Sequence, residues 1–339
     1  MTDFFDIASL SRPELIDLIS DSGDDTALYL AADKVRRLNY GNAVYIRGLI
    51  EVSNYCKNNC FYCGIRASNK NVDRYRLSKA DILNCCKEGY ALGFRTFVMQ
   101  GGEDSSFSDE FMCDVIYSIK SFYPECAVTL SLGERSYSSY KALYDAGADR
   151  YLLRHETATE SHYKRLHPDG MKLDIRKKCL FDLKKIGYQV GSGFMVGSPF
   201  QTYENLADDI LFLKELQPQM IGIGPFIPHV DTPFGGEKAG TVYLTLKMIS
   251  ISRLLFPKAL IPSTTALSTA AKDGTELGIK AGANVVMPNL SPLSVRSKYT
   301  LYNGKAYLGS EASERLSLLK EKLDKIGYKV TIDRGDAIK

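Results

Sequence analysis

A regular alternation of short apolar runs and longer amphipathic stretches, beginning near residue 44, constrains the fold more than any other feature of this sequence. The short runs are rich in β-branched and aromatic residues and predict strands, whereas the longer segments predict helices. Strands are predicted over residues 44–52, 96–100, 127–132, 150–155, 189–196, 220–227, 259–266 and 284–289. Helices are predicted over residues 79–92, 109–122, 137–146, 173–186, 204–216, 241–255, 275–281 and 311–326.

Eight strand–helix units in succession predict a parallel sheet with right-handed crossovers, and eight units are also the number that closes a barrel. Glycines suited to the left-handed backbone that ends a helix stand at four junctions, Gly93, Gly147, Gly187 and Gly282. A doubly wound open sheet is the alternative, but no linker or change of composition divides the units. We therefore expect an α/β fold in which residues 43–339 form a (β/α)8 TIM-type barrel with a C-terminal helix.

Residues 1–42 are predicted to form an N-terminal helical extension. Ser11, Pro13 and Glu14 are typical of a helix start, and a second helical stretch over residues 25–37 stops at Gly41. The acidic N-terminus lacks the basic and apolar regions of a signal or transit peptide. No apolar run approaches the roughly 20 residues of a membrane helix. We therefore expect a cytoplasmic protein with no membrane partner.

The charge balance and the cysteine content narrow the classes of partner and of site. The chain carries 43 basic and 40 acidic side chains, a net charge of +3 that supplies no extended field for phosphates, so we expect no nucleic-acid partner. Cytoplasmic thiols stay reduced, which argues against a disulfide framework for the eight cysteines. The spacing of the cysteines in the sequence indicates which of them could bind metal.

Three cysteines, Cys56, Cys60 and Cys63, lie within eight residues directly after the first predicted strand. In a barrel this loop lies at the C-terminal rim, where active sites form. Three thiolates are too few for structural zinc, which takes four protein ligands, but they can bind three irons of a 4Fe–4S cluster and leave the fourth iron open. The other cysteines are expected to be small buried apolar residues: Cys85, Cys86, Cys113, Cys126 and Cys179.

Further polar residues follow other predicted strands at the same rim. The paired glycines of the 101–104 segment would let a ligand approach the backbone closely, and Glu103 beside them could meet an ammonium group. Strand alternation places Arg154 and Glu156 on the same side. Arg176 opens a long helix, and its guanidinium could bind a carboxylate through two hydrogen bonds.

The Cys-x3-Cys-x2-Cys spacing, with the aromatic Tyr62 before the third cysteine, resembles the radical S-adenosylmethionine (SAM) superfamily. The resemblance implies a 4Fe–4S cluster whose open iron is chelated by SAM. It also implies reductive cleavage of SAM into methionine and a 5′-deoxyadenosyl radical.

Within the superfamily the chain resembles the biotin synthase-like group, and in that group it is most similar to the FeFe-hydrogenase maturase family HydE. The matching strings lie at residues 56–64, 74–77, 129–134, 150–157, 222–229, 231–233 and 286–289. This resemblance implies hydrogenase maturation, in which the adenosyl radical attacks the sulfur of an iron-bound cysteine during assembly of the di-iron subcluster. The implied partners are a small iron–cysteine–carbonyl–cyanide complex from the maturase HydG, the scaffold HydF and a low-potential electron donor.

The same resemblance assigns expected roles to individual residues. Those expected at SAM are Tyr62 (through its backbone), Gly101, Gly102, Glu103, Ser131, Glu156 and Arg176. Those expected to line the inner substrate cavity are Thr129, Arg154, Thr264, Thr265, Tyr299 and Tyr302. Some family members carry cysteines near the C-terminus for a second cluster, but here the last cysteine is Cys179, so no second cluster of that kind is expected.

Several alternatives remain open at this point. A methylornithine synthase-like radical mutase should differ most around residues 150–157 and 220–229, where this chain follows the maturase family. A biotin synthase is a weaker alternative, because no cysteines suggest the sacrificial 2Fe–2S cluster of that enzyme. A non-catalytic iron–sulfur protein would not cleave SAM, and a cluster-free barrel lyase would be colourless when prepared without oxygen.

Overall fold

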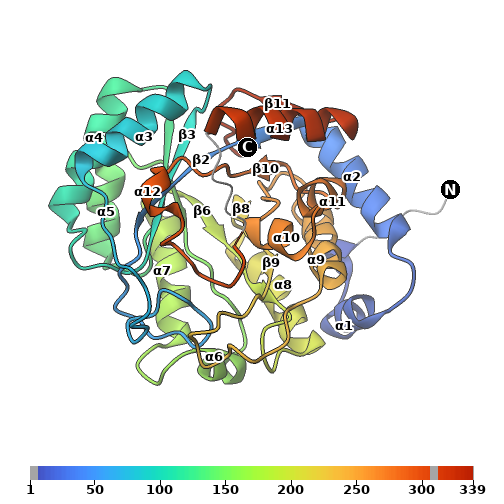
Figure 1. The fold of residues 1–339 in the computed structure, drawn as a ribbon. Helices are drawn as coiled ribbons and strands as arrows, with labels where there is room; N and C mark the ends of the chain where they lie inside the picture. Colours follow the sequence, from blue (N-terminus) through green and yellow to red (C-terminus); the bar gives the residue numbers. More distant parts are fainter. Residues whose placement is uncertain (1–6, 306–311, 339) are drawn as a thin grey trace.

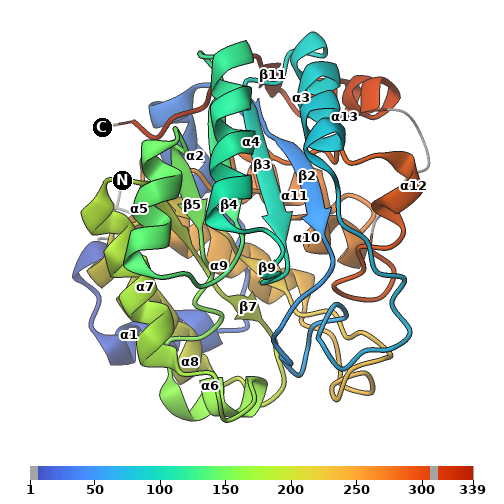
Figure 2. The same cartoon turned by 90° about the vertical axis from the view of Figure 1, so that its left-hand side faces the viewer.

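The computed structural model describes residues 7–305 and 312–338 (Figures 1 and 2). The strands are β1 (Ala43–Ile46), β2 (Gly48–Ser53), β3 (Thr96–Gly101), β4 (Ala127–Ser131), β5 (Arg150–Leu152), β6 (Gln189–Ser192), β7 (Met195–Val196), β8 (Met220–Ile221), β9 (Gly224–Pro225), β10 (Val285–Val286) and β11 (Lys329–Thr331). The helices are η1 (Ile7–Ser9), α1 (Arg12–Ser20), α2 (Thr26–Tyr40), α3 (Lys79–Ala91), α4 (Asp109–Phe122), α5 (Tyr137–Asp145), α6 (Glu160–Leu166), α7 (Leu173–Ile186), α8 (Tyr203–Leu216), α9 (Val242–Leu255), α10 (Thr265–Ala270), α11 (Gly274–Lys280), α12 (Leu293–Arg296) and α13 (Ala312–Lys325).

Parallel pairing closes the strands into a barrel. Six strands hydrogen-bond in the order β2-β3-β4-β5-β6-β8. Three isolated parallel bridges continue the ring: Met220 to Leu260, Pro262 to Val285, and Leu49 to Asn289. The 260–262 segment and the β10 segment therefore occupy the last two of eight positions and lead back to β2. The predicted (β/α)8 barrel is confirmed, with helices around the outside of the ring (Figure 1).

Helix bounds were predicted more accurately than strand bounds. The predictions over 109–122 and 173–186 coincide with α4 and α7, and those over the other barrel helices differ by one residue at one or both ends. The prediction over 25–37 ends three residues before α2 does, and the short helices α6, α10 and α12 were not predicted. The strand predicted over 44–52 is interrupted at Arg47, and its first half, β1, pairs with β10 and β11. The strand predicted over 259–266 is wrong in its second half, because Thr264 caps a helix that begins at Thr265. Residue 311, the predicted start of the last helix, lies outside the described residues.

The local signals at the helix ends are borne out. Ser11 and Glu14 form a capping box before α1, and α2 ends at Gly41. The four junction glycines named above all have φ between 95° and 114°. Helix α1 contacts α8, and α2 contacts α9, so the first two helices pack on the outer helical layer (Figure 1). None of the described helices has the length and apolar character that a membrane span requires.

The chain's C-terminal segment closes the N-terminal end of the barrel. Arg150 at the start of β5 is fully buried and donates to Asp336 Oδ1 at 2.5 Å and to the Thr96 hydroxyl at 3.0 Å. The Gly335 carbonyl accepts from the buried guanidinium of Arg47. These contacts place residues 334–336 across the end of the barrel opposite the rim at which the strands end.

Candidate active site

The cysteine loop leaves the C-terminal end of β2, where a barrel places its active site. Cys56, Cys60 and Cys63 are half-buried and form no disulfide. Burial raises the pKa of each thiol, and for Cys60 and Cys63 the neighbouring cysteines act in the same direction; the pKa of Cys63 rises to about 12. This mutual effect means that the sulfur atoms share one small, poorly solvated region.

The loop after β3 is packed directly on the cysteine loop. The Lys57 N–H donates to the Glu103 carbonyl at 3.0 Å, and the Gly102 N–H donates to the Ser53 carbonyl at 3.2 Å. A Cβ atom added at Gly102 would lie 2.2 Å from the Tyr55 carbonyl oxygen and 2.6 Å from Cys56 Cβ. Only glycine fits here, because the two loops touch through their backbones.

This donor set fits an iron–sulfur cluster better than a single metal ion. Among the described residues, no group of three His, Cys, Asp or Glu side chains is arranged to hold one metal ion. A 4Fe–4S cluster binds each thiolate through a separate iron, so its cysteines do not need to converge on one point. Buried thiols also need nearby positive charge before they can ionise. Cys56, Cys60 and Cys63 therefore fit the cluster expected from their spacing.

An ion-pair network lies beside the cysteine loop. The buried Arg176 places Nε 2.7 Å from Glu134 Oε1 and Nη2 4.0 Å from Glu103 Oε1. Glu103 also accepts from the Glu134 N–H at 3.0 Å and lies 3.2 Å from Lys57 Nζ. Burial raises the pKa of Glu134, although the charge of Arg176 opposes this. Glu103 and Arg176 were both expected at SAM from the sequence. Glu134 was given no role, because it was noted only as part of the string at residues 129–134 that resembles the maturase family.

The end of β5 brings Arg154 and Glu156 together, as strand alternation predicted. Arg154 Nη2 lies 3.0 Å from Glu156 Oε2, but the two atoms are not aligned as a hydrogen bond. Glu156 has φ 67°, a backbone conformation that is uncommon for a non-glycine residue and often found at functional sites. Arg154 Nε, Arg154 Nη2 and Glu156 Oε2 are all buried without a hydrogen-bond partner among the described residues. Such groups remain available to a bound ligand.

His155, between these two residues, faces away from the barrel interior. Its Nδ1 lies 2.9 Å from the Ser192 hydroxyl, and its Nε2 lies 3.2 Å from Asp209 Oδ1 on α8. Both His155 and Asp209 are fully buried. His155 thus has the outward direction that strand alternation requires of the residue between Arg154 and Glu156.

The side chain of Tyr62 packs in an aromatic cluster with His167 and Tyr163. Its hydroxyl lies 3.2 Å from His167 Nε2, and the two rings meet edge to face at 5.4 Å. The ring of Tyr163 stacks on His167 at 3.9 Å, and its hydroxyl is buried without a hydrogen-bond partner among the described residues. The backbone of Tyr62, which lies between Cys60 and Cys63, is thereby held at a defined position.

The residues expected in the inner cavity come from several segments of the chain. Thr129 of β4 is paired in register with Arg150, and its buried hydroxyl has no partner in the described part of the chain. The Tyr299 hydroxyl accepts from Gln100 Nε2 at 3.4 Å, and Tyr302 is close enough to Arg154 for that charge to lower its pKa, although burial raises it overall.

Three other predicted site residues, Thr264, Thr265 and Ser131, lie at the ends of a helix or a strand. Thr264 accepts from the Leu267 N–H as the N-cap of α10, and Thr265 is the first residue of that helix. A Cβ atom at Gly224 would lie 2.8 Å from the Thr264 hydroxyl, so this cap reaches the barrel wall. Ser131 is half-buried at the end of β4, in register with Gln100.

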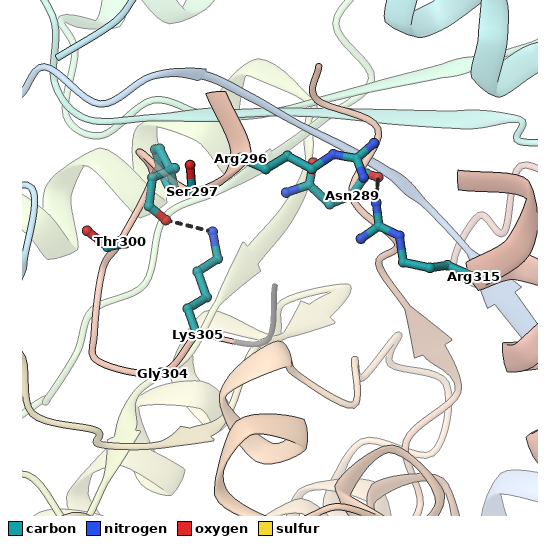
Figure 3. A pocket seen from close by; sticks show the side chains of 8 residues that line it. Asn289, Arg296, Ser297, Thr300, Gly304, Lys305 and Arg315 are labelled. Atoms are coloured by element: carbon teal, nitrogen blue, oxygen red, sulfur yellow. Dashed lines mark hydrogen bonds between the residues drawn. The ribbon is translucent and has the colours of Figure 1, made fainter. Parts of the chain in front are cut away.

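A side cavity of about 170 Å³ adjoins Tyr299 where β2, α12 and α13 meet (Figure 3). It is lined by Asn289, Arg296, Ser297, Tyr299, Thr300, Gly304, Lys305 and Arg315. Lys305 donates to the Tyr299 carbonyl at 2.9 Å and pairs with the buried carboxylate of Glu51. Sequence reasoning missed Glu51, although a carboxylate within an otherwise apolar strand is a signal that could have identified it.

Comparisons with known proteins agree with the geometry. Residues 50–213 match the family model of the Radical SAM superfamily. The FeFe hydrogenase maturase subunit HydE of Thermotoga maritima is 44% identical over 94% of this chain and 90% of that protein. The 3-methylornithine synthase of Methanosarcina acetivorans is 29% identical over 86% of this chain and 83% of that protein. Among solved structures, methylornithine synthase is similar with a TM-score of 0.84 and 27% identity, covering 96% of each chain.

Proposed function

The chain belongs to the radical SAM superfamily of enzymes and, within it, to the HydE family of hydrogenase maturases, and we propose that its substrate is a small anionic iron complex carrying a cysteine. In this proposal SAM is cleaved to methionine and a 5′-deoxyadenosyl radical. The C5′ carbon of that radical would then form a bond to the sulfur of the iron-bound cysteine during assembly of the di-iron subcluster, and the electron left over would reduce the iron of the substrate complex by one unit.

The residues of the cysteine loop and the β5 end divide the first step between them. A 4Fe–4S cluster bound by Cys56, Cys60 and Cys63 would supply the electron that cleaves SAM. Glu156 and Arg176 would hold the amino and carboxylate groups of the methionine moiety, because each offers a buried charge of the opposite sign. The backbones of Gly101, Gly102 and Tyr62 and the side chains of Glu103 and Ser131 would complete this site.

The single observation that carries the substrate class is the guanidinium of Arg154. Its Nε and Nη2 atoms are buried without a hydrogen-bond partner among the described residues, although Nη2 lies 3.0 Å from Glu156 Oε2. A guanidinium with buried donors that make no hydrogen bond binds anions such as carboxylate or cyanide. The hydroxyls of Thr129, Thr264, Thr265, Tyr299 and Tyr302 would supply the remaining polar contacts.

The partners and location follow from the family and are part of the same proposal. The iron complex, with its carbonyls and cyanide, would come from HydG, and the product would pass toward the scaffold HydF. A low-potential carrier would reduce the cluster, and the reaction would take place in the cytoplasm. We further propose that residues 43–339 form the catalytic barrel and residues 1–42 an extension that packs on its outside.

An anaerobic turnover assay tests this function. The reconstituted protein is incubated with SAM, dithionite and the iron–cysteine–carbonyl–cyanide complex, and products are identified by mass spectrometry. We expect an adduct of adenosyl carbon with cysteine sulfur, which an Arg154→Gln variant should form at least about tenfold more slowly. Turnover of lysine to methylornithine instead would assign the chain to the alternative that its structural neighbour represents.

A further inference from the structure

Arg74 binds four backbone carbonyls of the cysteine loop with a single guanidinium. Its Nη1 donates to the carbonyl of Asn54 and, at 2.8 Å, to that of Ile65. Its Nη2 donates to the carbonyls of Arg66 at 2.7 Å and Asn69 at 3.1 Å. Asn54 precedes the first cysteine, and the other three residues follow the last one.

The guanidinium therefore joins the two ends of the segment that contains all three cysteines. Other contacts support the same closure: the Asn54 amide donates to the Asp73 carbonyl at 2.9 Å, and the Asn69 amide donates to the Gly64 carbonyl at 2.7 Å. The segment between the ends has no helix or strand of its own. Its shape depends on such cross-links, because its carbonyls have no ladder to pair with.

We propose that Arg74 is a positioning residue that clamps the cysteine loop in the shape that binds the iron–sulfur cluster. The inference rests on the proposed use of Cys56, Cys60 and Cys63 as cluster ligands. Only arginine suits this place, because the guanidinium presents five N–H donors in one fixed plane. A lysine ammonium carries the same charge but has three donors around one point, so it cannot span four carbonyls on two sides.

The guanidinium of Arg74 also brings a positive charge to the backbone on both sides of the three cysteines. Arg74 and Arg76 both lie over the ring of Tyr55, at 5.9 and 3.6 Å from the ring centre, which holds the side of the loop next to Cys56. A positive charge at this place favours the more negative, reduced state of a bound cluster.

The test separates the clamp from the charge. Arg74→Lys keeps the charge and removes the planar donor set, whereas Arg74→Gln removes both. Arg95→Lys is the matched control, because Arg95 Nη1 also donates to two backbone carbonyls, of Tyr90 and Phe94, but away from the cysteines. After anaerobic reconstitution, loss of iron to a chelator is timed, and the reduction potential is measured by EPR.

We expect both Arg74 variants to lose iron about tenfold faster than the wild type, as is typical when a residue that orients metal ligands is changed. Arg95→Lys should behave as the wild type. The potential should become more negative in Arg74→Gln and change little in Arg74→Lys. Iron retention in Arg74→Lys equal to that of the wild type would overturn the clamp, because the charge alone would then suffice.

Trypsin digestion of the iron-free chain tests the clamp independently of any cluster. The loop contains cleavage sites after Lys57, Arg66 and Lys70. The Arg74 variants should be cut there faster than the Arg95→Lys control, while their circular dichroism stays that of a folded barrel. Unchanged cutting would overturn the inference. If the wild type itself bound no iron, the proposed function would fail while this measurement would still report on the clamp.

Discussion

At the scale of single residues, the site is defined by buried polar atoms that have no hydrogen-bond partner in the described part of the chain. An unpaired buried group is costly, so its retention indicates a ligand or a mechanical role. Arg154 and Glu156 carry three such atoms although they lie side by side. Their juxtaposition could be predicted because residues two apart in a strand share a face. The pairing of Glu51 with Lys305 and that of Glu134 with Arg176 could not be predicted, since the partners are far apart in the sequence.

Removing the charge of Glu156 should weaken SAM binding specifically. In Glu156→Gln we expect the dissociation constant for SAM to rise by about tenfold or more, the usual effect of losing a hydrogen bond to a charged group. Equilibrium dialysis with the reconstituted protein measures this. Glu160→Gln is the control, because Glu160 is an exposed residue that pairs with Lys164 on its own helix. Equal affinity in the wild type and Glu156→Gln would remove Glu156 from the SAM site.

His167 should make the iron-free chain less stable in mild acid. Burial lowers its pKa from 6.5 to about 3, so the folded chain keeps it neutral while the unfolded chain binds a proton below pH 6.5. Stability should therefore fall as the pH drops from 6.5 toward 3, by about 2 kcal/mol at pH 5 for this residue. Urea unfolding at several pH values should show a shallower decline in His167→Gln, which cannot titrate. An unchanged decline would contradict the neutral state of His167.

At the scale of elements, the sequence specified the helices well and the barrel strands less well. The helices carry their own signals in caps and apolar stripes, as the match of α4 and α7 shows. The strand at 44–52 is divided at Arg47, whose side chain contacts Met220 Sδ and the Gly335 carbonyl, partners that no local pattern reveals. Residues 260–262 pair only through isolated bridges, and Pro262 has no N–H to extend the ladder.

Because the loops after β2 and β3 are in contact, adding one methyl group at Gly102 should lower both the stability and the iron content of the protein. In Gly102→Ala the new Cβ would meet the Tyr55 carbonyl oxygen and Cys56 Cβ, so the two loops must separate. We expect a loss of about 1–3 kcal/mol in stability and less than half of the wild-type iron content after reconstitution. Iron analysis and thermal unfolding measure the two effects.

Gly170→Ala provides the comparison for that experiment, because a Cβ there has no atom within 4 Å. It should bind iron and unfold as the wild type does. If Gly102→Ala also matched the wild type, the backbones of the two loops would not be in contact as the structure describes.

At the scale of the whole molecule, the two ends of the barrel have separate roles. The C-terminal rim carries the cysteine loop and the residues that we propose bind SAM, whereas the opposite end is sealed by residues 334–336. The position of the cysteine loop at this rim was predicted correctly from the sequence, because barrel enzymes place their active sites at the C-terminal ends of the strands. No pattern in the sequence indicated the seal, since Arg150 and Asp336 are 186 residues apart and each resembles an ordinary surface charge.

The seal should hold the fold together more strongly at neutral than at acidic pH. Burial raises the pKa of Asp336, but the hydrogen bonds from Arg334 and the charge of Arg150 outweigh it and lower the pKa well below its ordinary value of 3.8. The stabilisation is therefore complete above about pH 4 and is lost as the pH falls through the lowered pKa. Asp336→Asn should remove it at every pH and leave the buried Arg150 without its carboxylate.

We expect Asp336→Asn to cost about 2 kcal/mol at pH 7, less than a fully buried pair because the Asp336 side chain is 39% exposed. Denaturant unfolding of the iron-free chain at pH 7 and at pH 3 measures both the loss and its pH dependence. Asp324→Asn on the exposed side of α13 should have no effect at either pH. The difference between wild type and Asp336→Asn should shrink on acidification. A difference that stays constant between the two pH values would mean that packing of the C-terminal segment, and not its charge, closes the barrel.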